Sequence, residues 1–271
     1  HRYADGARTP FEEHLVEGVK YACADRQVRL HFTVSPEHRA LFEALAEKCA
    51  PRFVQNEGVQ LDITFSEQKP STDTVAANPD GTPFRNADGS LLFRPGGHGA
   101  LIENLNDLDA DVVFVKTVDN VCPDRLKADT VTYKQVLAGL LVSLQARAFA
   151  YLEELEAGDV SEERLHEMLQ FVEKDLHCHS DAAEALEGLE LLDYLYCRLN
   201  RPMRVCGMVR NVGEPGGGPF LAYNPDGSVS LQILESSQID MNDPSKKALF
   251  EQGTHFNPVD LVCGLRDFNG E

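Results

Sequence analysis

Hydrophobic and polar residues alternate with two different periods along the first third of the chain. Residues 28–34 and 59–65 alternate apolar with polar side chains one by one, which predicts two half-buried strands. Thr9-Pro10 and Ser35-Pro36 each place a capping residue before a proline, so we expect one helix before the strands and one between them. The order strand, helix, strand predicts a parallel pair joined by a right-handed crossover.

The next segment, residues 66–100, is rich in glycine, proline, asparagine and aspartate. Asn78-Pro79-Asp80-Gly81 and Asn86-Ala87-Asp88-Gly89 predict turns within it. A loop of this length in a compact domain is usually functional. The apolar run at 111–116 then predicts a buried central strand, which ends at residues 117–120.

The hydrophobic period becomes helical from about residue 124 to residue 200. It predicts three helices, over 133–155, from Ser161 onward and over 181–199. These acidic helices suit a cap or an oligomerisation element, but a packing scaffold is favoured because apolar stripes usually face a core. Strands return afterwards, and the whole pattern predicts an α/β protein. Its expected segments are 1–123, 124–202 and 203–271.

Composition and charge exclude several classes of protein. The chain has 271 residues, of which 42% are hydrophobic and 25% charged, as in globular proteins. Its 25 basic and 44 acidic residues give a net charge of −19, which repels nucleic-acid backbones, so we expect no nucleic-acid partner. No run reaches the roughly 20 apolar residues that span a bilayer, so we expect no membrane and a cytoplasmic location. A start without methionine and a turn-like end suggest an internal piece of a longer protein.

Cysteine and histidine positions give little support to a metal site. The seven cysteines are irregularly spaced and form no Cys-x-x-Cys pair, so reduced thiols are expected. The run His177-Cys178-His179 invites a metal interpretation. Adjacent residues point in different directions, however, and no second pair of ligands appears at a suitable spacing, so a metal is not favoured there.

Two local patterns carry candidate chemistry. In Arg94-Pro95-Gly96-Gly97-His98-Gly99-Ala100-Leu101 the glycines allow a ligand to approach the backbone closely, just before a helical pattern. The run is neither a Walker loop nor a Gly-x-Gly-x-x-Gly fingerprint, and a tight turn is the alternative. Asp119-Asn120 follows a buried strand, at the end where open α/β sheets bind ligands, and a carboxylate there can hold Mg²⁺. An Asx turn is the alternative for this pair.

Further motifs accompany these two in a definite order. They are Gln68-Lys69-Pro70-Ser71, the Pro-Gly-Gly-His-Gly loop, Val118-Asp119-Asn120, Val-Cys-Gly-Met-Val at 205–209, Ile-Leu-Glu-Ser-Ser at 233–237 and Gly253-Thr254-His255-Phe256-Asn257. This order resembles the UDP-sugar pyrophosphorylases, especially the UDP-N-acetylglucosamine type. The chain is also similar to an uncharacterised bacterial family, a domain of unknown function, which shares the RPGGHGAL, GEPGGGPF, LQILESSQID and THFNPVDLVCG sequences. The resemblance spans most of the chain outside 124–200.

The resemblance implies a Rossmann-like (GT-A-like) nucleotidyltransferase domain, with a mixed, mainly parallel central sheet and a helical insertion. The implied reaction joins a nucleoside triphosphate and a sugar 1-phosphate into a nucleotide sugar and pyrophosphate, with Mg²⁺ as cofactor. Asp119 corresponds to the catalytic aspartate that holds the metal. The residues at nucleotide-binding positions are Gln68, Gly96, Gly97, His98 and Gly99. Those at sugar-binding positions are Gly207, Glu235, Thr254 and Asn257.

The chain also departs from the pattern of that family. A Gly-rich loop with arginine and a following Pro-Lys segment, which act on the triphosphate, are missing, as is a lysine beyond Asn257. We therefore expect the full-length protein to be the nucleotidyltransferase and this piece to be its body. A non-catalytic protein that binds a nucleotide or a sugar nucleotide is the alternative. A scaffold that forms oligomers through the helical insertion is a third hypothesis.

Overall fold

The computed structural model describes the whole chain except Asp5, Glu214, Pro215 and the side chain of His98. The described residues form two compact units, His1–Asp109 and Ala110–Glu271. Each unit has a hydrophobic core of its own. The boundary lies directly before the strand predicted at 111–116.

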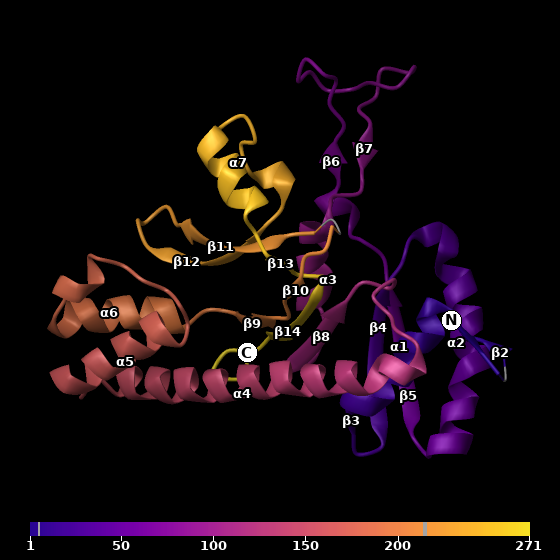
Figure 1. The fold of residues 1–271 in the computed structure, drawn as a ribbon, viewed down its shortest axis with the longest axis horizontal. Helices are drawn as coiled ribbons and strands as arrows, with labels where there is room; N and C mark the ends of the chain where they lie inside the picture. The colour runs from indigo at the N-terminus through magenta and orange to yellow at the C-terminus, as the bar shows by residue number, and fades with distance from the viewer. Residues whose placement is uncertain (5, 214–215) are drawn as a thin grey trace. The chain divides into compact units, whose positions relative to one another are not determined.

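A parallel pair of strands and two helices are the main elements of the first unit (Figure 1). Strand β4 (Gln27–Thr33) pairs in parallel with β5 (Gln60–Ser66), and helix α2 (Pro36–Glu57) lies between them in the sequence. Helix α1 (Pro10–Tyr21) begins with a capping box: Thr9 Oγ1 accepts from the Glu12 N–H, and the Thr9 N–H donates to the Glu12 carboxylate. The predicted helices and the parallel strand pair are confirmed.

The remaining elements of this unit are short. They are β1 (Arg2–Tyr3), β2 (Gly6–Ala7), β3 (Cys23–Ala24), η1 (Pro70–Thr72), β6 (Thr74–Val75), β7 (Phe93–Arg94), η2 (His98–Leu101) and α3 (Ile102–Asn106). Strand β3 pairs with the start of β4, and β6 pairs with β7, both antiparallel.

Aromatic rings form the core of the first unit. Phe11 of α1 is buried, and its ring centroid lies 4.6 Å from that of Phe32 in β4 and 6.3 Å from that of Phe65 in β5. Alternate residues of a strand point to the same face, so the apolar positions of both strands are turned toward the helices. The alternation in the sequence therefore marks the buried face of the strands correctly.

The loop predicted at 66–100 is ordered by its own turns. Asn-x-Asp-Gly-Thr/Ser occurs at 78–82 and again at 86–90, and each aspartate accepts hydrogen bonds from the N–H and the hydroxyl two residues later. Three backbone hydrogen bonds close a ring, in which Ala76 donates to Leu92, Leu92 to Phe84, and Phe84 to Ala76. Figure 1 shows the loops that extend from β6 and β7. Both predicted turns are confirmed.

The second unit contains a three-stranded sheet in the order β8–β14–β9. Strands β8 (Val112–Lys116) and β9 (Met203–Cys206) both pair antiparallel with β14 (Asp260–Gly264), which lies between them. Strands β8 and β9 therefore run in the same direction, and their carboxyl ends lie at the same edge of the sheet. The candidate site lies at this edge of the sheet.

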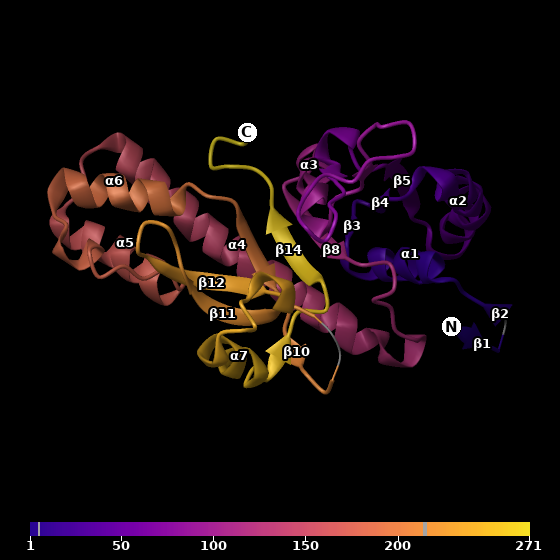
Figure 2. The ribbon, with the colours of Figure 1, turned by 90° about the horizontal axis from the view of Figure 1, so that it is seen from above.

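Three helices of the second unit pack together around an apolar core. They are α4 (Lys127–Ala157), α5 (Glu162–Lys174) and α6 (Gly188–Leu199). Figure 2 shows α5 and α6 beside the final turns of α4. Tyr151 and Leu152 of α4 are buried there against Phe171 of α5 and Leu195 of α6. The helical segment thus has its own core within the unit that also holds the sheet.

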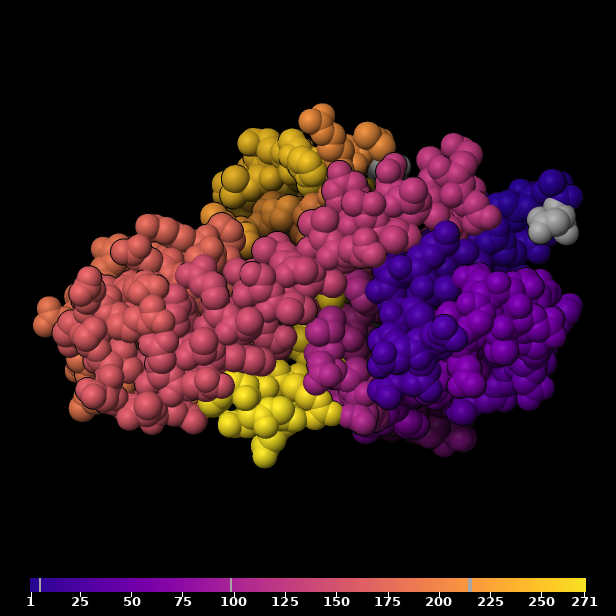
Figure 3. All heavy atoms as spheres, turned by 90° about the horizontal axis from the view of Figure 1, so that it is seen from below, coloured from indigo at the N-terminus to yellow at the C-terminus, as the bar shows by residue number. Residues whose placement is uncertain are grey.

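Helix α4 is unusual in its apolar composition. The helical segment Asp124–Ala157 is long and apolar enough to cross a membrane, by length and composition only, and 22% of its most apolar window is buried. Figure 3 shows this helix along one face, beside the C-terminal segment, where Gln145 Nε2 donates to the Arg266 carbonyl across 3.4 Å. One such helix is weak support for a membrane location, so the expected absence of a membrane stays a prediction.

Three consecutive glycines, of which Gly218 is the first residue of β11, lead into a hairpin of β11 (Gly218–Tyr223) and β12 (Val229–Leu234). A Cβ atom on Gly216 would lie 2.5 Å from Cδ2 of Phe256, and one on Gly217 would lie 2.5 Å from Cγ2 of Ile233. Glycine is therefore required here by close packing rather than by flexibility. The other elements of this unit are η3 (Asp124–Leu126), η4 (Ala183–Ala185), β10 (Val209–Arg210), η5 (Ser236–Gln238), α7 (Pro244–Glu251) and β13 (His255–Phe256).

The structure confirms a mixed α/β protein, with helices and several small sheets. Among the described residues, β4 and β5 form the one parallel pair, and the other paired strands are antiparallel. A mainly parallel central sheet is not shown among these strands. The reason is that β14 returns between β8 and β9, a long-range pairing that no local pattern signals. The helices of 124–202 and the strands of 203–271 share one unit.

Candidate functional site

Three of the predicted site residues lie at one edge of the β8–β14–β9 sheet. Asp119 follows the end of β8, Gly207 directly follows β9, and Asn257 lies just before β14. Because β14 is antiparallel to its neighbours, its first residue, Asp260, lies opposite Lys116, the last residue of β8. Segments that are distant in sequence therefore meet at the carboxyl ends of β8 and β9.

Asn257 holds this junction together through a buried side-chain amide, which is 6% exposed. Its Nδ2 donates to the carbonyls of Gly207 (2.7 Å) and Asp260 (3.2 Å), and its Oδ1 accepts from the Val259 N–H (2.9 Å). Val259 has a φ of 54°, which β-branched residues rarely adopt, and these bonds hold it. The amide thus braces the turn before β14, and its contact with a sugar stays a prediction.

The loop after β8 brings Asp119 to the same edge. Asn120 Nδ2 donates to the Pro258 carbonyl (3.0 Å), which ties this loop to the segment that contains Asn257. Asp119 is exposed, and no ion pair joins its carboxylate to the part of the chain that the structure describes. An exposed carboxylate at this edge can serve as an oxygen ligand. It fits Mg²⁺, which is usually held by one or two carboxylates together with waters and phosphates.

A buried lysine at this edge was not found by sequence reasoning. Lys134 of α4 is 1% exposed and forms an ion pair with Asp260, and its Nζ lies 5.6 Å from the ring centroid of Phe114. Its only signal in the sequence is a charged residue within an apolar helical run. Lys134 thereby connects the long helix to the start of β14.

Glu235 and Asn257 lie on either side of Gly217. The Asn257 N–H donates to the Gly217 carbonyl (2.8 Å), while a Cβ on Gly217 would lie 3.4 Å from Cγ of Glu235. Glu235 is exposed and caps the short helix η5, where its N–H donates to Oε1 of Gln238 (2.9 Å). Both predicted sugar-binding residues therefore border Gly217, Asn257 through its backbone N–H and Glu235 through its side chain.

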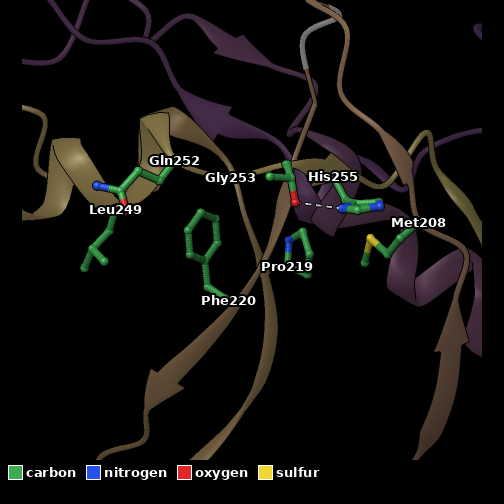
Figure 4. A pocket seen from close by; sticks show the side chains of 8 residues that line it. Met208, Pro219, Phe220, Leu249, Gln252, Gly253 and His255 are labelled. Atoms are coloured by element: carbon green, nitrogen blue, oxygen red, sulfur yellow. Dashed lines mark hydrogen bonds between the residues drawn. The ribbon is translucent and has the colours of Figure 1, made fainter.

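Thr254 lines a pocket of about 360 Å³ in the second unit. Figure 4 shows the Phe220 ring between Leu249 and Pro219, and the hydrogen bond between Thr254 Oγ1 and His255 Nδ1 (2.9 Å). The lining residues are Met208, Pro219, Phe220, Leu249, Gln252, Gly253, Thr254 and His255. Its lining combines apolar side chains with the Thr254 hydroxyl, the Gln252 amide and the His255 imidazole.

Cys206 directly precedes Gly207 but is not suited to act as a nucleophile. Burial raises the pKa of the Cys206 thiol, and burial also raises the pKa of Cys263 in the neighbouring strand. The thiolate is the reactive form of cysteine, so both side chains stay neutral and inert at physiological pH. This agrees with the absence of a cysteine-based motif in the sequence.

In the first unit, the predicted nucleotide-binding residues Gln68 and Gly96 contact each other. The Gln68 amide accepts from the Gly96 N–H (2.7 Å) and the Thr72 hydroxyl (3.1 Å), and donates to the Gly96 carbonyl (3.1 Å). Gly96 is also tightly packed, since a Cβ there would lie 3.0 Å from the Thr72 carbonyl oxygen. The glutamine side chain therefore holds the start of the glycine-rich loop.

Gly97 and Gly99 differ from Gly96 because no described contact within the first unit requires glycine at either position. Neither has a positive φ, and no described atom lies within 4 Å of a Cβ built on either residue. Their backbone is thus accessible without steric need for glycine. His98 belongs to η2, and its side chain lies outside the described residues, so its predicted contact with a base stays a prediction.

Comparison with known proteins identifies a family but no activity. No curated protein and no solved structure matches the chain. The family described as Domain of unknown function (DUF4301) matches residues 1–271. On the strength of that match over the whole length, this chain belongs to the DUF4301 family.

Proposed function

We propose that this chain is the substrate-binding body of a Mg²⁺-dependent nucleotidyltransferase. The enzyme would convert a nucleoside triphosphate and a sugar 1-phosphate into a nucleotide sugar and pyrophosphate. The meeting of Asp119, Gly207 and Asn257 at one edge of a sheet carries the proposal. These residues stand at the metal-binding and sugar-binding positions of the pyrophosphorylase pattern, although they are far apart in the chain.

The chemistry of this edge supports binding of a sugar phosphate. Asp119 would hold the metal ion, which supplies charge neutralisation at the phosphates when bound. The Gly207 carbonyl accepts one hydrogen bond from Asn257 Nδ2 and has a second lone pair for a sugar hydroxyl. We assign the exposed Glu235 carboxylate and the Thr254 hydroxyl of the pocket to the same sugar-binding role. In-line transfer at phosphorus depends mostly on such positioning and charge neutralisation.

The first unit would supply recognition of the nucleobase. A glutamine amide offers one donor and one acceptor side by side, which matches the imide edge of uracil. In the free chain this pair of groups contacts the N–H and the carbonyl of Gly96, so a uracil base would replace Gly96 on the Gln68 amide. Gly97 and Gly99 lack side chains where their own unit leaves open space, as is useful where a ligand must approach the backbone.

We also propose that the finer fold is GT-A-like. Its support is the parallel pair β4 and β5 with the helix α2 between them in sequence, together with β8 and β9, which run in the same direction. We further propose that the protein is cytoplasmic, as the sequence predicts.

Pyrophosphate release by the full-length protein tests the function. We expect release from UTP, or another nucleoside triphosphate, with at least one sugar 1-phosphate in the presence of Mg²⁺. Asp119→Asn should lower the rate by roughly 100-fold or more, since it removes a charge that acts on the reacting phosphates. The matched control is Asp193→Asn, because Asp193 is exposed on α6 and outside the proposed site.

Calorimetric titration with UTP, UDP-N-acetylglucosamine and UDP-glucose separates catalysis from binding. Binding of a nucleotide without pyrophosphate release from any substrate pair would identify a non-catalytic sugar-nucleotide-binding protein instead. If the full-length protein neither binds a nucleotide nor releases pyrophosphate, the proposed function is wrong.

A further inference from the structure

A histidine and two glutamates gather in the second unit, outside the site described above. Ligand atoms of Glu173, His179 and Glu184 all lie within 4.8 Å of one another. Glu173 comes from the last turn of α5, His179 from the following loop and Glu184 from the 3₁₀ helix η4. His179 belongs to the run His177-Cys178-His179, for which the sequence showed no further ligands at a suitable spacing. The structure supplies two carboxylates, Glu173 before the run and Glu184 after it.

The hydrogen bonds of His179 orient one ring nitrogen toward the carboxylates. Its Nε2 lies 3.0 Å from Oδ1 of Asp181, so in the neutral ring Nε2 carries the proton and Nδ1 carries the lone pair. Nδ1 faces Oε1 of Glu173 at 3.4 Å. A lone pair and a carboxylate oxygen repel each other at this distance, so a positive charge between them is favourable.

The oxygen of Glu173 that faces His179 is itself unsatisfied. Oε1 is shielded from solvent and accepts no hydrogen bond of normal geometry from the described residues. His179 Nδ1 can pair with this oxygen only when the ring is protonated, and in the neutral ring a bound cation would take that place.

We propose that Glu173, His179 and Glu184 bind a divalent transition-metal ion of the zinc type. Imidazole nitrogen with carboxylate oxygens suits Zn²⁺ and its neighbours, whereas Mg²⁺ prefers oxygen alone. Zinc ligands lie about 2.0–2.2 Å from the ion, so the side chains must close in slightly, and Glu184 is exposed and free to rotate. Asp181 supplies the carboxylate that fixes the ring of a metal-binding histidine.

The bound ion would tie the end of α5 to the hairpin. The backbone of His179 is held against Val229 by two hydrogen bonds, of 2.9 and 2.8 Å, at the start of β12. With Glu173 on the helix and His179 on this bridge, the ion would join α5 to the start of β12. The site leaves a coordination position for water, since the protein supplies three ligands.

Titration of the chelator-treated, reduced full-length protein with Zn²⁺ tests the proposal. We expect one ion per chain by calorimetry, and binding at least ten-fold weaker in Glu173→Gln and in His179→Gln. Asp181→Asn keeps all three ligands, is fully exposed at 99%, and should weaken binding about 10- to 100-fold. The matched controls are His166→Gln and Glu163→Gln, which lie exposed on α5 and should bind as the wild type does.

Substitution with Co²⁺ identifies the ligand type. We expect visible bands of a nitrogen and oxygen site without thiolate charge-transfer absorption, and Zn²⁺ should raise the melting temperature of the wild type but not of the two ligand variants. Circular dichroism before metal addition verifies that each variant is folded. No binding at one equivalent, or wild-type affinity in both ligand variants, would show that a proton on His179, rather than a metal, fills this place. Thiolate absorption would overturn the proposal by showing that cysteines bind the ion instead.

Discussion

The side-chain amide of Asn257 donates a hydrogen bond to the Gly207 carbonyl oxygen across 2.7 Å. Fifty residues separate the two in the sequence, and both stand at positions that a family resemblance assigns to sugar binding. Their contact means that the side chain of one holds the backbone of the other. A substitution at Asn257 should therefore change stability as well as any binding at this edge.

Asn257→Ala should destabilise the second unit by about 2–3 kcal/mol. The change leaves the Gly207 carbonyl and the Val259 N–H without their partner in a buried place, which is the costly case for a lost hydrogen bond. Urea unfolding measures the difference in the free energy of unfolding. Asn242→Ala, at an exposed position, serves as the control and should change stability by less than about 0.5 kcal/mol.

Two glycine-to-alanine changes should affect different properties of the protein, stability in one case and nucleotide binding in the other. Gly217→Ala places a methyl group 2.5 Å from Cγ2 of Ile233 and should lower stability by about 1–3 kcal/mol. Gly97→Ala meets open space and should leave stability unchanged while it weakens nucleotide binding. Thermal unfolding and calorimetric titration with UTP measure the two properties. Unchanged UTP affinity in Gly97→Ala would contradict the base-binding role of this loop.

Gln68→Ala should weaken UTP binding by about ten-fold, which corresponds to 1.4 kcal/mol. The paired donor and acceptor of this side chain hold Gly96 in the free chain, and a nucleobase would replace Gly96 on them. The ratio of UTP to CTP affinity should fall as well, since the amide reads the edge of the base. Gln55→Ala on α2 is exposed and should behave like the wild type. An unchanged affinity ratio would argue against base recognition by Gln68.

Asp226 should make the second unit sensitive to acid. Hydrogen bonds from the Ser228 hydroxyl and from Arg198 lower the pKa of Asp226 well below its ordinary value of 3.8. The folded state thus prefers the ionised form, and its stabilising effect is complete above that ordinary value and lost as the pH falls below it. Between about pH 5 and pH 2, Asp226→Asn should therefore lose less stability than the wild type.

The control for this acid effect is Asp80→Asn. Asp80 lies in a turn of the same kind in the first unit. Hydrogen bonds from Thr82 lower the pKa of Asp80, and no arginine contributes to this shift. The pH dependence of the melting temperature should change less in Asp80→Asn than in Asp226→Asn. Equal pH profiles for the wild type and Asp226→Asn would show that the ion pair with Arg198 does not form in solution.

Cysteine labelling should separate exposed from buried thiols. Cys23 and Cys197 are exposed, whereas burial raises the pKa values of Cys206 and Cys263. Alkylation at about pH 8 should modify the exposed pair at least ten-fold faster, because only the thiolate reacts. Mass spectrometry of peptides measures each rate, with the urea-unfolded chain as the reference. Rapid labelling of Cys206 in the folded protein would contradict the packing of β9 on β14.

Local signals in the sequence predicted the first unit well. The capping box at Thr9, the alternation in β4 and β5, and the Asn-x-Asp-Gly turns each depend on residues only a few positions apart. The candidate loop was found by its glycines, although the structure separates them: Gly96 is required by packing, while Gly97 and Gly99 are not. No sequence rule distinguishes a glycine needed for packing from one that leaves room for a ligand.

The sequence by itself determined where α1, α2 and α5 begin, which strand faces of the first unit are buried and where turns occur, because these follow from short-range hydrogen bonding and from the period of apolar residues. The helix predicted at 133–155 begins instead at Lys127, and the one predicted at 181–199 begins at Gly188. Only the tertiary structure decided that β14 lies between β8 and β9, that Asn257 reaches Gly207, and that Lys134 reaches Asp260. It also brought Glu173 and Glu184 to His179. Such contacts depend on strand register and on the packing of distant segments, which gain their free energy only when the whole unit is assembled.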